Sequence, residues 1–346
     1  MARGRRTGRK KNGAGAAKWA AILLVWLLMI AGAGAWLVMT PYGPTTETFV
    51  EIAPGSGTLK IGQQLEQAGI VRSGYAFDLM RWWKRGSLRA GEYRFAEPAT
   101  VGTVYGRIAR GDVYTKTVVV PEGANVFDIA ARMEQAGLGT QRAFLEAAEA
   151  DTKLIKSVDP GATSLEGYLF PDTYHFARKA TPEQICAMMV RRFRAVAAQL
   201  GLKENIHRVV TMASLVERET AVDAERPLVA SVFTNRLAKK MPLETDPAVI
   251  YGLELEGRWT GTIYASDLKY DTPYNTYLHA GLPPGPVANP GARSLRAAMA
   301  PAATNYLFFV AAGSDAQGRS VFTSSLKEHH SNVTGYRHAL KKAGRR

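Results

Sequence analysis

The stretch "TMASLVERET", residues Thr211–Thr220, places an apolar run directly before three charged side chains. The run Met212–Val216 is apolar except for one serine, which predicts a helix buried in the core. Glu217 follows this run at once. It is either a solvated residue at a helix end or an acid held in an apolar wall, and the rest of the chain must decide between the two.

The helical period separates the two acids of this stretch. Glu217 shares a face with Val210 and Ala213, whereas Glu219 lies about 200° away, beside Leu215. Both carboxyl groups therefore have apolar neighbours on the predicted helix. Periodicity alone does not choose between them.

Length and charge limit the classes of function. The chain has 346 residues, enough for two domains with real cores. Half of its net charge of +14 comes from residues 1–18, which contain seven Lys and Arg and no acid. The remaining moderate basicity suits many polyanions, and no RNA- or DNA-binding motif is present. Nucleic acid is not expected as a partner.

Metal and cofactor motifs are missing from the sequence. Cys186 is the single cysteine, so it forms no intrachain disulfide and no cysteine metal cluster. The six histidines contain no H-E-x-x-H pattern, and the adjacent pair His329 and His330 cannot face one site from a regular element. Ser324–Lys327 matches S-x-x-K without its K-T-G partner, which we attribute to chance. We expect no metal and no cofactor.

One segment predicts a membrane anchor. Residues 19–39 form an uncharged apolar run, which as a helix spans about 31 Å, the thickness of one bilayer core. The run is too long for a cleaved signal peptide and continues past the small residues at Ala31–Ala33. The basic residues 1–18 predict a cytoplasmic tail, with everything after Thr40 outside. This topology suits a single-pass protein of the bacterial cytoplasmic membrane, where the large extracytoplasmic polymer is peptidoglycan.

A faint internal repeat follows the anchor. Ile52–Gly55 matches Val120–Gly123, and Leu65–Gly69 matches Met133–Gly137, both at an offset of 68 residues. Each unit is predicted as a strand, a turn, an amphipathic helix and a second helix. The glycine that closes each later block favours a helix end, because glycine adopts the left-handed conformation.

The predicted fold class is α+β. Residues 47–117 have a β-α-α-β pattern that resembles a LysM domain, a small module that binds N-acetylglucosamine polymers; a plain α+β spacer fits the pattern equally well. Residues 118–340 are predicted to form a mixed α/β catalytic domain with a helical core. Its later half is rich in Pro, Gly, Asn and Tyr, which indicates long binding loops.

Carboxyl groups are the remaining source of chemistry. Glycoside cleavage usually needs two of them. Lytic transglycosylation needs only one, which protonates the glycosidic oxygen and then takes a proton from the C6 hydroxyl of the same N-acetylmuramic acid. That acid must start protonated, and burial against apolar groups favours this by raising a carboxyl pKa. Glu217, beside Ala213 and Val216, meets this requirement.

Over nearly its whole length the chain closely resembles the YceG-like family of endolytic murein transglycosylases. The resemblance rests on the ordered blocks "TMASLVERET", "ERPLVASVFTNRL", "MPLETDPAVIYGL" and "YNTYLHAGLPPGPVANPGARSLRAAMAP". It implies cleavage of the MurNAc-GlcNAc bond inside nascent glycan strands, which leaves 1,6-anhydro ends and stops elongation near the synthesis machinery. It also implies Glu217, the first Glu of its block, as the catalytic acid and Tyr277 as a second important group.

Other residues of these blocks receive supporting roles. Four are candidates for contact with the sugar: Asp246, Tyr251, Asn275 and Thr276. Their alternative role is loop packing, because Asn and Asp also form turns. Three more are expected to support the helix or to orient Glu217: Glu219, Glu225 and Arg226.

Two other classes of function stay open. A hydrolytic muramidase would use water and a second carboxylate such as Asp246, and would release reducing-end sugars. A membrane-tethered scaffold that binds glycan would release no product. The expected partners are peptidoglycan strands and the membrane, with peptidoglycan synthases as protein partners.

Overall fold

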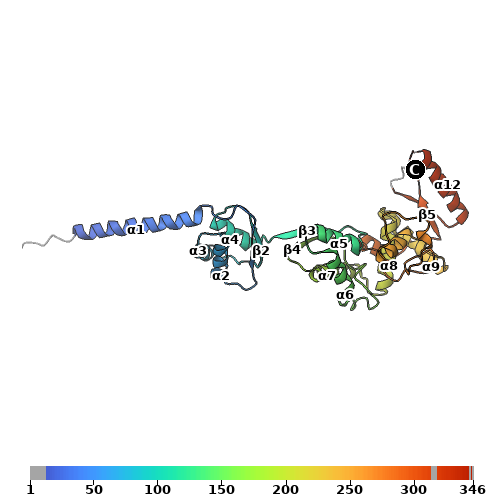
Figure 1. The fold of residues 1–346 in the computed structure, drawn as a ribbon, viewed down its shortest axis with the longest axis horizontal. Coiled ribbons are helices and arrows are strands. Elements are labelled where there is room, and N and C mark those ends of the chain that lie inside the picture. The colour runs from blue at the N-terminus through green and yellow to red at the C-terminus, as the bar shows by residue number, and fades with distance from the viewer. Residues whose placement is uncertain (1–12, 313–317, 343, 345–346) are drawn as a thin grey trace, which may run out of the picture. The chain divides into compact units, whose positions relative to one another are not determined.

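The computed structural model describes residues 13–312, 318–342 and 344 (Figure 1). Residues 1–12 of the predicted basic tail, which spans residues 1–18, lie outside the described residues. The chain divides after Thr115 into two compact units. We call them the N-terminal unit and the C-terminal unit, and describe each by itself.

The chain begins with one long apolar helix, α1 (Gly13–Met39). Its stretch Ala17–Met39 has a mean hydropathy of 2.4, and none of it is buried in protein. A helix of this length and composition is able to cross a bilayer once. This agrees with the anchor that the sequence predicts for residues 19–39.

The rest of the N-terminal unit is a β-α-α-β pattern followed by one more helix. Its elements are β1 (Thr48–Ile52), α2 (Thr58–Gln67), α3 (Gly74–Lys84), β2 (Gly91–Phe95) and α4 (Val101–Arg110). The two strands pair antiparallel, with Val50 opposite Tyr93. Both side chains point into the core, as the alternation of the strands requires. The element order is the predicted one, and α4 is an addition to it.

The two helices of this pattern cross at a pair of glycines. A Cβ atom on Gly62 would lie 2.5 Å from the carbonyl oxygen of Gly74, and one on Gly74 would lie 2.7 Å from the carbonyl carbon of Gly62. Only glycine permits this approach. The close crossing lets Ile61 and Phe77 meet in one core.

The same pattern opens the C-terminal unit. Its elements are β3 (Thr115–Val119), α5 (Val126–Gln135), α6 (Gln141–Ala150), η1 (Thr152–Leu154) and β4 (Thr173–Ala177), and β3 pairs with β4. Both ends of α5 lie 68 residues after those of α2, the predicted offset. Gly69 and Gly137 follow these two helices with φ angles of 69° and 67°. The predicted helix ends are therefore observed.

A set of helices and loops forms the rest of this unit. They are α7 (Pro182–Leu200), α8 (Ile206–Glu219), η2 (Asp223–Glu225), α9 (Arg226–Ala238), α10 (Asp246–Leu255), η3 (Asp267–Lys269) and α11 (Ala292–Met299). A capping box at Thr181 and a proline at the first helical position begin α7, and Gly201 ends it.

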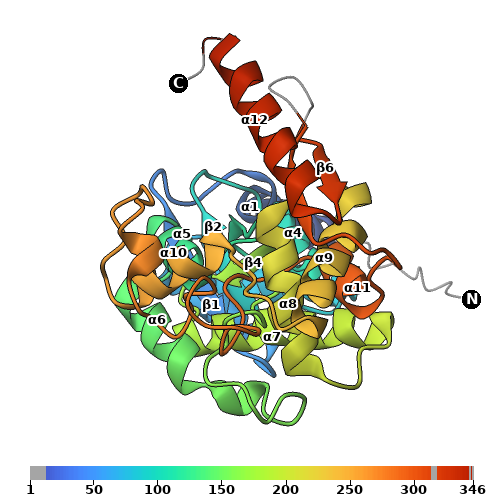
Figure 2. The same ribbon diagram turned by 90° about the vertical axis from the view of Figure 1, so that its right-hand side faces the viewer.

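The helix α8 carries the stretch with the two acids. It packs against α9 and α11 (Figure 2). Val210 and Ala213 belong to the core shared with the β-α-α-β part, whereas Leu215 and Val216 belong to a second core with α9. Because α8 is buried on both sides, its C-terminal end is fixed between two packed layers.

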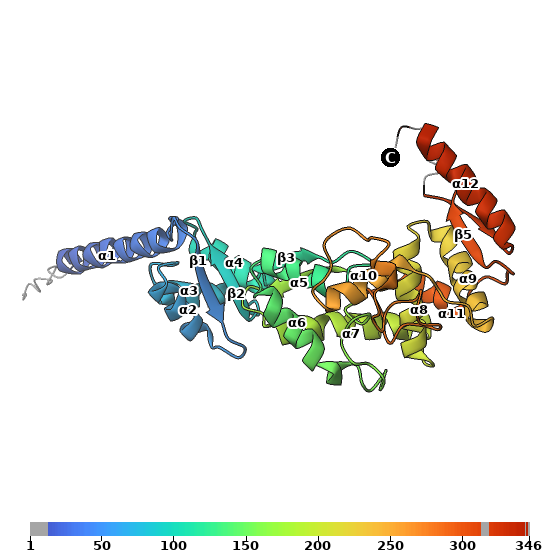
Figure 3. The ribbon, with the colours of Figure 1, turned by 45° about the vertical axis from the view of Figure 1, so that its right-hand side comes forward.

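The C-terminal unit ends in a hairpin and a helix. β5 (Phe308–Ala311) pairs antiparallel with β6 (Ser320–Thr323), and α12 (Leu326–Lys342) packs on this hairpin (Figure 3). β5 also contacts α9. Each described sheet has two strands among many helices, which agrees with the predicted α+β class.

Candidate active site

A pocket lies beside the C-terminal end of α8, and we call it the Glu219 pocket. It has a volume of ≈ 300 Å³. Glu219, the last residue of α8, lines this pocket. Asp246 and Tyr277 line it as well. The other residues that line it are Phe233, Arg236, Leu243, Glu244, Phe309 and His329. The pocket therefore combines carboxyl groups with aromatic surface and one imidazole.

Glu219 is poised to exchange a proton. Burial raises its pKa to about 7, and the charge of Asp246 adds to this effect, while Arg218 and Arg236 act against it. A carboxyl group with this pKa exists near neutral pH in both its protonated and its charged form. Such a group is able to give a proton in one step and take one back in the next.

Asp246 and Tyr277 meet across the same pocket. Asp246 is the first residue of α10, and the hydroxyl of Tyr277 donates to its Oδ1 at 2.7 Å. Burial and this contact with Asp246 raise the pKa of Tyr277, so the side chain stays a neutral phenol. Two of the residues predicted for the site thus lie together beside Glu219.

Asn275 and Thr276 are buried in the loop that carries Tyr277. The Asn275 amide donates to the Tyr270 carbonyl at 2.8 Å, and its Oδ1 accepts from the Tyr277 backbone N–H at 2.9 Å. Thr276 Oγ1 accepts from the N–H of Thr245, the residue before Asp246, at 2.9 Å. These side chains hold the loops on which Tyr277 and Asp246 sit.

Glu217 points to a different side of α8. Its Oε1 forms an ion pair with Arg226 Nη1 at 2.6 Å, and its Oε2 accepts from the Gly291 N–H at 2.9 Å. The Glu217 side chain is only 4% exposed. The predicted support by Arg226 is confirmed, and both oxygens of Glu217 are engaged by donors from other elements.

Glu225 lies beside this pair but holds a different element. It accepts from the backbone N–H of Ser320 at 2.8 Å, which ties β6 to the start of α9. Glu225 therefore supports the C-terminal hairpin. The residue that contacts Glu217 is Arg226.

A second hollow, of ≈ 430 Å³, is lined by Glu217 and Arg226, and Glu219 lines it as well. It contains Glu122, from the turn after β3, whose pKa is raised by burial and then by the charge of Glu217. A Cβ on Gly291 would lie 1.9 Å from a Glu122 carboxyl oxygen, so the two acids meet at this glycine. Glu122 could not be selected from the sequence, since it lies 95 residues before Glu217 along the chain.

Tyr251 is not part of the Glu219 pocket. Its buried ring packs edge-on to Tyr274, and its hydroxyl bonds with Glu166. Glu166 is 1% exposed, accepts from Asn289 Nδ2 at 2.7 Å, and has a pKa raised to about 8 by burial. This buried acid was not predicted, although its place inside the apolar run "SLEGYLF" is a usable signal.

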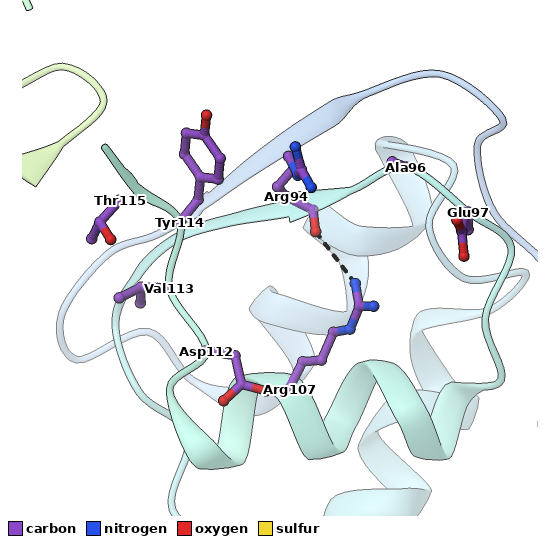
Figure 4. A pocket seen from close by; sticks show the side chains of 8 residues that line it. All are labelled: Arg94, Ala96, Glu97, Arg107, Asp112, Val113, Tyr114 and Thr115. Carbon is purple, nitrogen blue, oxygen red and sulfur yellow. Dashed lines mark hydrogen bonds between the residues drawn. The ribbon is translucent and has the colours of Figure 1, made fainter. Parts of the chain in front are cut away.

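The N-terminal unit has a hollow of its own (Figure 4). It has a volume of ≈ 520 Å³. The Arg94 guanidinium lies 5.5 Å from the centre of the Tyr114 ring, and Arg107 donates to the Arg94 carbonyl at 3.4 Å. The remaining lining residues are Ala96, Glu97, Asp112, Val113 and Thr115. This surface offers donors, acceptors and one aromatic face to a polar ligand.

Comparison with known proteins gives close relatives. The chain is 34% identical over 306 residues to the endolytic murein transglycosylase of Bacillus subtilis strain 168, covering 82% of this chain and 83% of that protein. It is 29% identical over 317 residues to the protein of the same name from Streptococcus pneumoniae serotype 2 strain D39, of which it spans 57%. The crystal structure of a YceG-like protein from Listeria monocytogenes superposes with a TM-score of 0.54 at 31% identity, covering 83% of this chain and 99% of that one.

The family assignment follows from the extent of these matches. The model of the YceG-like family matches residues 50–335, which includes both units outside the apolar helix. The matched range contains α8, the Glu219 pocket and the loop of Tyr277. The chain belongs to the YceG-like family.

Proposed function

We propose that the Glu219 pocket is the catalytic site of a peptidoglycan lytic transglycosylase. Its relatives from Bacillus and Streptococcus are named endolytic murein transglycosylases, and this chain is an enzyme of the same kind. The observation that carries the placement of the site is Glu219, an acid with a pKa of about 7 in a pocket lined by Asp246 and Tyr277.

In the proposed reaction Glu219 acts twice. Protonated Glu219 first gives its proton to the oxygen between N-acetylmuramic acid and N-acetylglucosamine, and the bond from that oxygen to C1 of the N-acetylmuramic acid breaks. The Glu219 carboxylate then removes the proton from the C6 hydroxyl of the same sugar. The C6 oxygen bonds to C1 and closes the 1,6-anhydro ring, so no water is consumed.

We prefer Glu219 to Glu217, the residue that the family resemblance implies. Both oxygens of Glu217 accept from donors of the protein, Arg226 and the Gly291 N–H, and the side chain is almost fully buried. Each oxygen of Glu217 therefore already accepts one hydrogen bond from the protein, and a substrate would have to share these oxygens with Arg226 and the Gly291 N–H. Glu217 remains the competing assignment, and the two acids are separated by matched Gln variants.

Asp246 and Tyr277 are assigned supporting roles. The negative charge of Asp246 favours the protonated form of Glu219, which is the form that the first step needs. The Tyr277 hydroxyl orients Asp246 through the 2.7 Å hydrogen bond. Asn275 and Thr276 fix the backbone around both groups, so we assign them to positioning.

Hydrolysis is the second candidate, because Glu219 shares the pocket with a second carboxyl group, Asp246, that could activate water. If Asp246 activated a water molecule, the same acid would yield reducing-end sugars. Mass spectrometry of sacculi digested by the purified full chain decides between the two reactions. Anhydro-sugar products support transglycosylation, reducing ends support a muramidase, and absence of any product leaves only the scaffold.

We further propose the orientation of the chain. The apolar helix crosses the cytoplasmic membrane once, with residues 1–18 in the cytoplasm and the C-terminal unit outside. The seven basic residues before the span, and the absence of Lys or Arg from Trp19 to Leu59, support this direction. The site is thereby on the side of the membrane where nascent strands and their synthases are found.

The N-terminal unit is proposed to bind glycan weakly, as a LysM-like module. Its β-α-α-β order and the hollow around Arg94 and Tyr114 support this role. Aromatic faces with neighbouring donors suit sugar rings, because one face of a ring is apolar and its edge is polar. If the N-terminal unit were only a spacer, it would not need the aromatic ring of Tyr114 at its surface.

A further inference from the structure

One helix of the N-terminal unit is apolar on two faces. The core face of α3 contains Phe77 and Met80, which are buried. A second apolar stripe lies on the solvent side of α3, at the helical spacing i, i+4, i+7 and i+8. Its side chains are large and between 59% and 76% exposed: Tyr75, Leu79, Trp82 and Trp83. We call these residues the α3 stripe.

The composition of the α3 stripe suits the surface of a bilayer. Single exposed apolar residues are common on proteins, whereas a contiguous apolar patch marks an interaction site. Trp82 and Trp83 are the only exposed tryptophans outside α1 among the described residues of the N-terminal unit. Tryptophan and tyrosine collect at the boundary between lipid and water, because each combines an apolar ring with a polar N–H or O–H group.

Basic side chains flank the α3 stripe. Residues 72–89 contain five Lys and Arg and a single acid, Asp78. Lys84 and Arg85, at the end of α3, are exposed. Long basic side chains can lay their apolar stems on a lipid surface while their charges stay among the headgroups. Aromatic residues beside Lys and Arg are therefore complementary to anionic phospholipids.

The apolar helix α1 leads directly into the folded part of this unit. It contacts both α3 and α4 (Figures 1 and 3). Val38, in the last turn of α1, packs against the core of the unit, and Tyr42 forms a β-bridge with Ala99. The chain thus enters the fold within three residues of the end of α1.

Arg72 holds the start of α3 against the end of α1. Its guanidinium lies 4.2 Å from the centre of the Trp36 ring and 4.8 Å from the centre of the Tyr42 ring. Trp36 is about 5 Å from the end of α1, at a rise of 1.5 Å per residue. Gly74, the first residue of α3, follows Arg72 by two positions. If α1 spans a bilayer, α3 therefore lies at the level of the lipid headgroups.

We propose that the α3 stripe and its flanking basic residues dock on the anionic phospholipid surface of the membrane that α1 spans. The inference rests on the proposed anchor and does not depend on which acid of α8 is catalytic. Docking would add a second contact with the lipid to the single helix. The N-terminal unit would then be held at the membrane surface, close to the place where nascent strands are made.

The test measures the depth of a fluorescent dye on the full chain, reconstituted in vesicles of phosphatidylglycerol and phosphatidylcholine. Leu79→Cys carries the dye nitrobenzoxadiazole, while the native Cys186 is fully buried and stays unlabelled. We expect blue-shifted emission and quenching by lipids that carry a nitroxide on the acyl chain. The matched control is the dye at Ala53→Cys, in the exposed turn after β1, which should stay in water and unquenched.

Two pairs of substitutions separate the apolar from the ionic contribution. Trp82→Ser with Trp83→Ser should return the dye at residue 79 to water. The melting temperature should stay unchanged, because both rings are exposed. Lys84→Gln with Arg85→Gln should lower the ratio of docked to undocked protein about fivefold for each charge removed. Vesicles of phosphatidylcholine alone should lower this ratio as well.

A dye at Leu28→Cys, in the middle of α1, reports insertion of the anchor separately. If this dye is quenched while the dye at residue 79 stays in water, the inference is overturned and the anchor stands. If the dye at Leu28→Cys is not quenched, the proposed anchor fails and the inference fails with it. A dye at residue 79 that is shielded from water but unquenched by the nitroxide lipids also overturns the inference. In that case protein covers the α3 stripe, and shielding that grows with the ratio of protein to lipid identifies a second copy of the chain.

Discussion

Replacement of Glu219 by Gln separates catalysis from folding. Glutamine keeps the shape of the side chain and removes its ability to exchange a proton. If Glu219 is both acid and base, anhydro-sugar formation should fall by at least the range of about 10²–10⁴ typical of a single acid–base group. The assay is release of anhydro-muropeptides from sacculi by equal amounts of folded protein.

The same variant has a stability signature that follows from its pKa. The pKa of Glu219 is about 7 in the folded chain against an ordinary value of 4.5. A group with a raised pKa stabilises the folded state at low pH, and this advantage is lost as pH rises through about 7. The difference corresponds to about 3 kcal/mol at pH 9, an upper limit because Glu219 keeps some exposed surface.

Glu219→Gln should therefore become more stable relative to the parent as pH rises from 5 to 9, by up to about 3 kcal/mol. Chemical unfolding of both full chains in detergent, at pH 5 and at pH 9, measures this change. A stability difference that stays constant across this range would show that Glu219 does not titrate near neutrality. The reasoning that selects it as the acid would then be refuted.

Glu217→Gln is the matched control on the same helix. It removes the charge that pairs with buried Arg226, and loss of one partner of such a pair costs up to about 3–5 kcal/mol. We expect lower stability with a much smaller loss of activity per folded molecule. A folded but inactive Glu217→Gln protein beside an active Glu219→Gln protein would return the catalytic role to Glu217.

Three further predictions concern the pocket, the N-terminal unit and the anchor. Asp246→Asn removes a charge that raises the pKa of Glu219, so the high-pH limb of kcat/KM should move to lower pH; an unmoved limb would contradict this coupling. Tyr114→Ala in the full chain, with Glu219→Gln present, should reduce retention on purified sacculi more than Tyr75→Ala, an exposed tyrosine on α3; equal retention would favour the spacer. A reporter fused after Arg346 should be active only if it functions outside the cytoplasm, and activity of a cytoplasm-only reporter would reverse the proposed topology.

The features that the sequence predicted well are local or repeated. The 68-residue offset located α5 from α2, because both helices have the same apolar period and the same closing glycine. The uncharged run of residues 19–39 located the anchor, because a bilayer imposes a length. The β-α-α-β order followed from turn signals at Pro and Gly. None of these features depends on which distant segments meet.

The separate roles of Glu217 and Glu219 could not be predicted in this way. The period of α8 placed both Glu217 and Glu219 beside apolar neighbours and did not choose between them, and only the family resemblance implied Glu217. Their environments come from other elements: Arg226 and Gly291 engage Glu217, whereas Asp246 approaches Glu219. These partners lie up to 74 residues away along the chain, and only the folded structure brings them to the helix end that carries both acids.

The histidine pair shows how a sound local argument can stop too early. Two adjacent histidines on a helix do not share a face, which excludes a joint metal site for His329 and His330. It does not exclude a role for one of them alone. His329 stacks on Phe308 and lines the Glu219 pocket, whereas His330 stays exposed, so the two neighbours have different environments. A residue such as His329 can line a pocket without belonging to any sequence motif. Such residues are found from the packing of the helix that carries them, here α12.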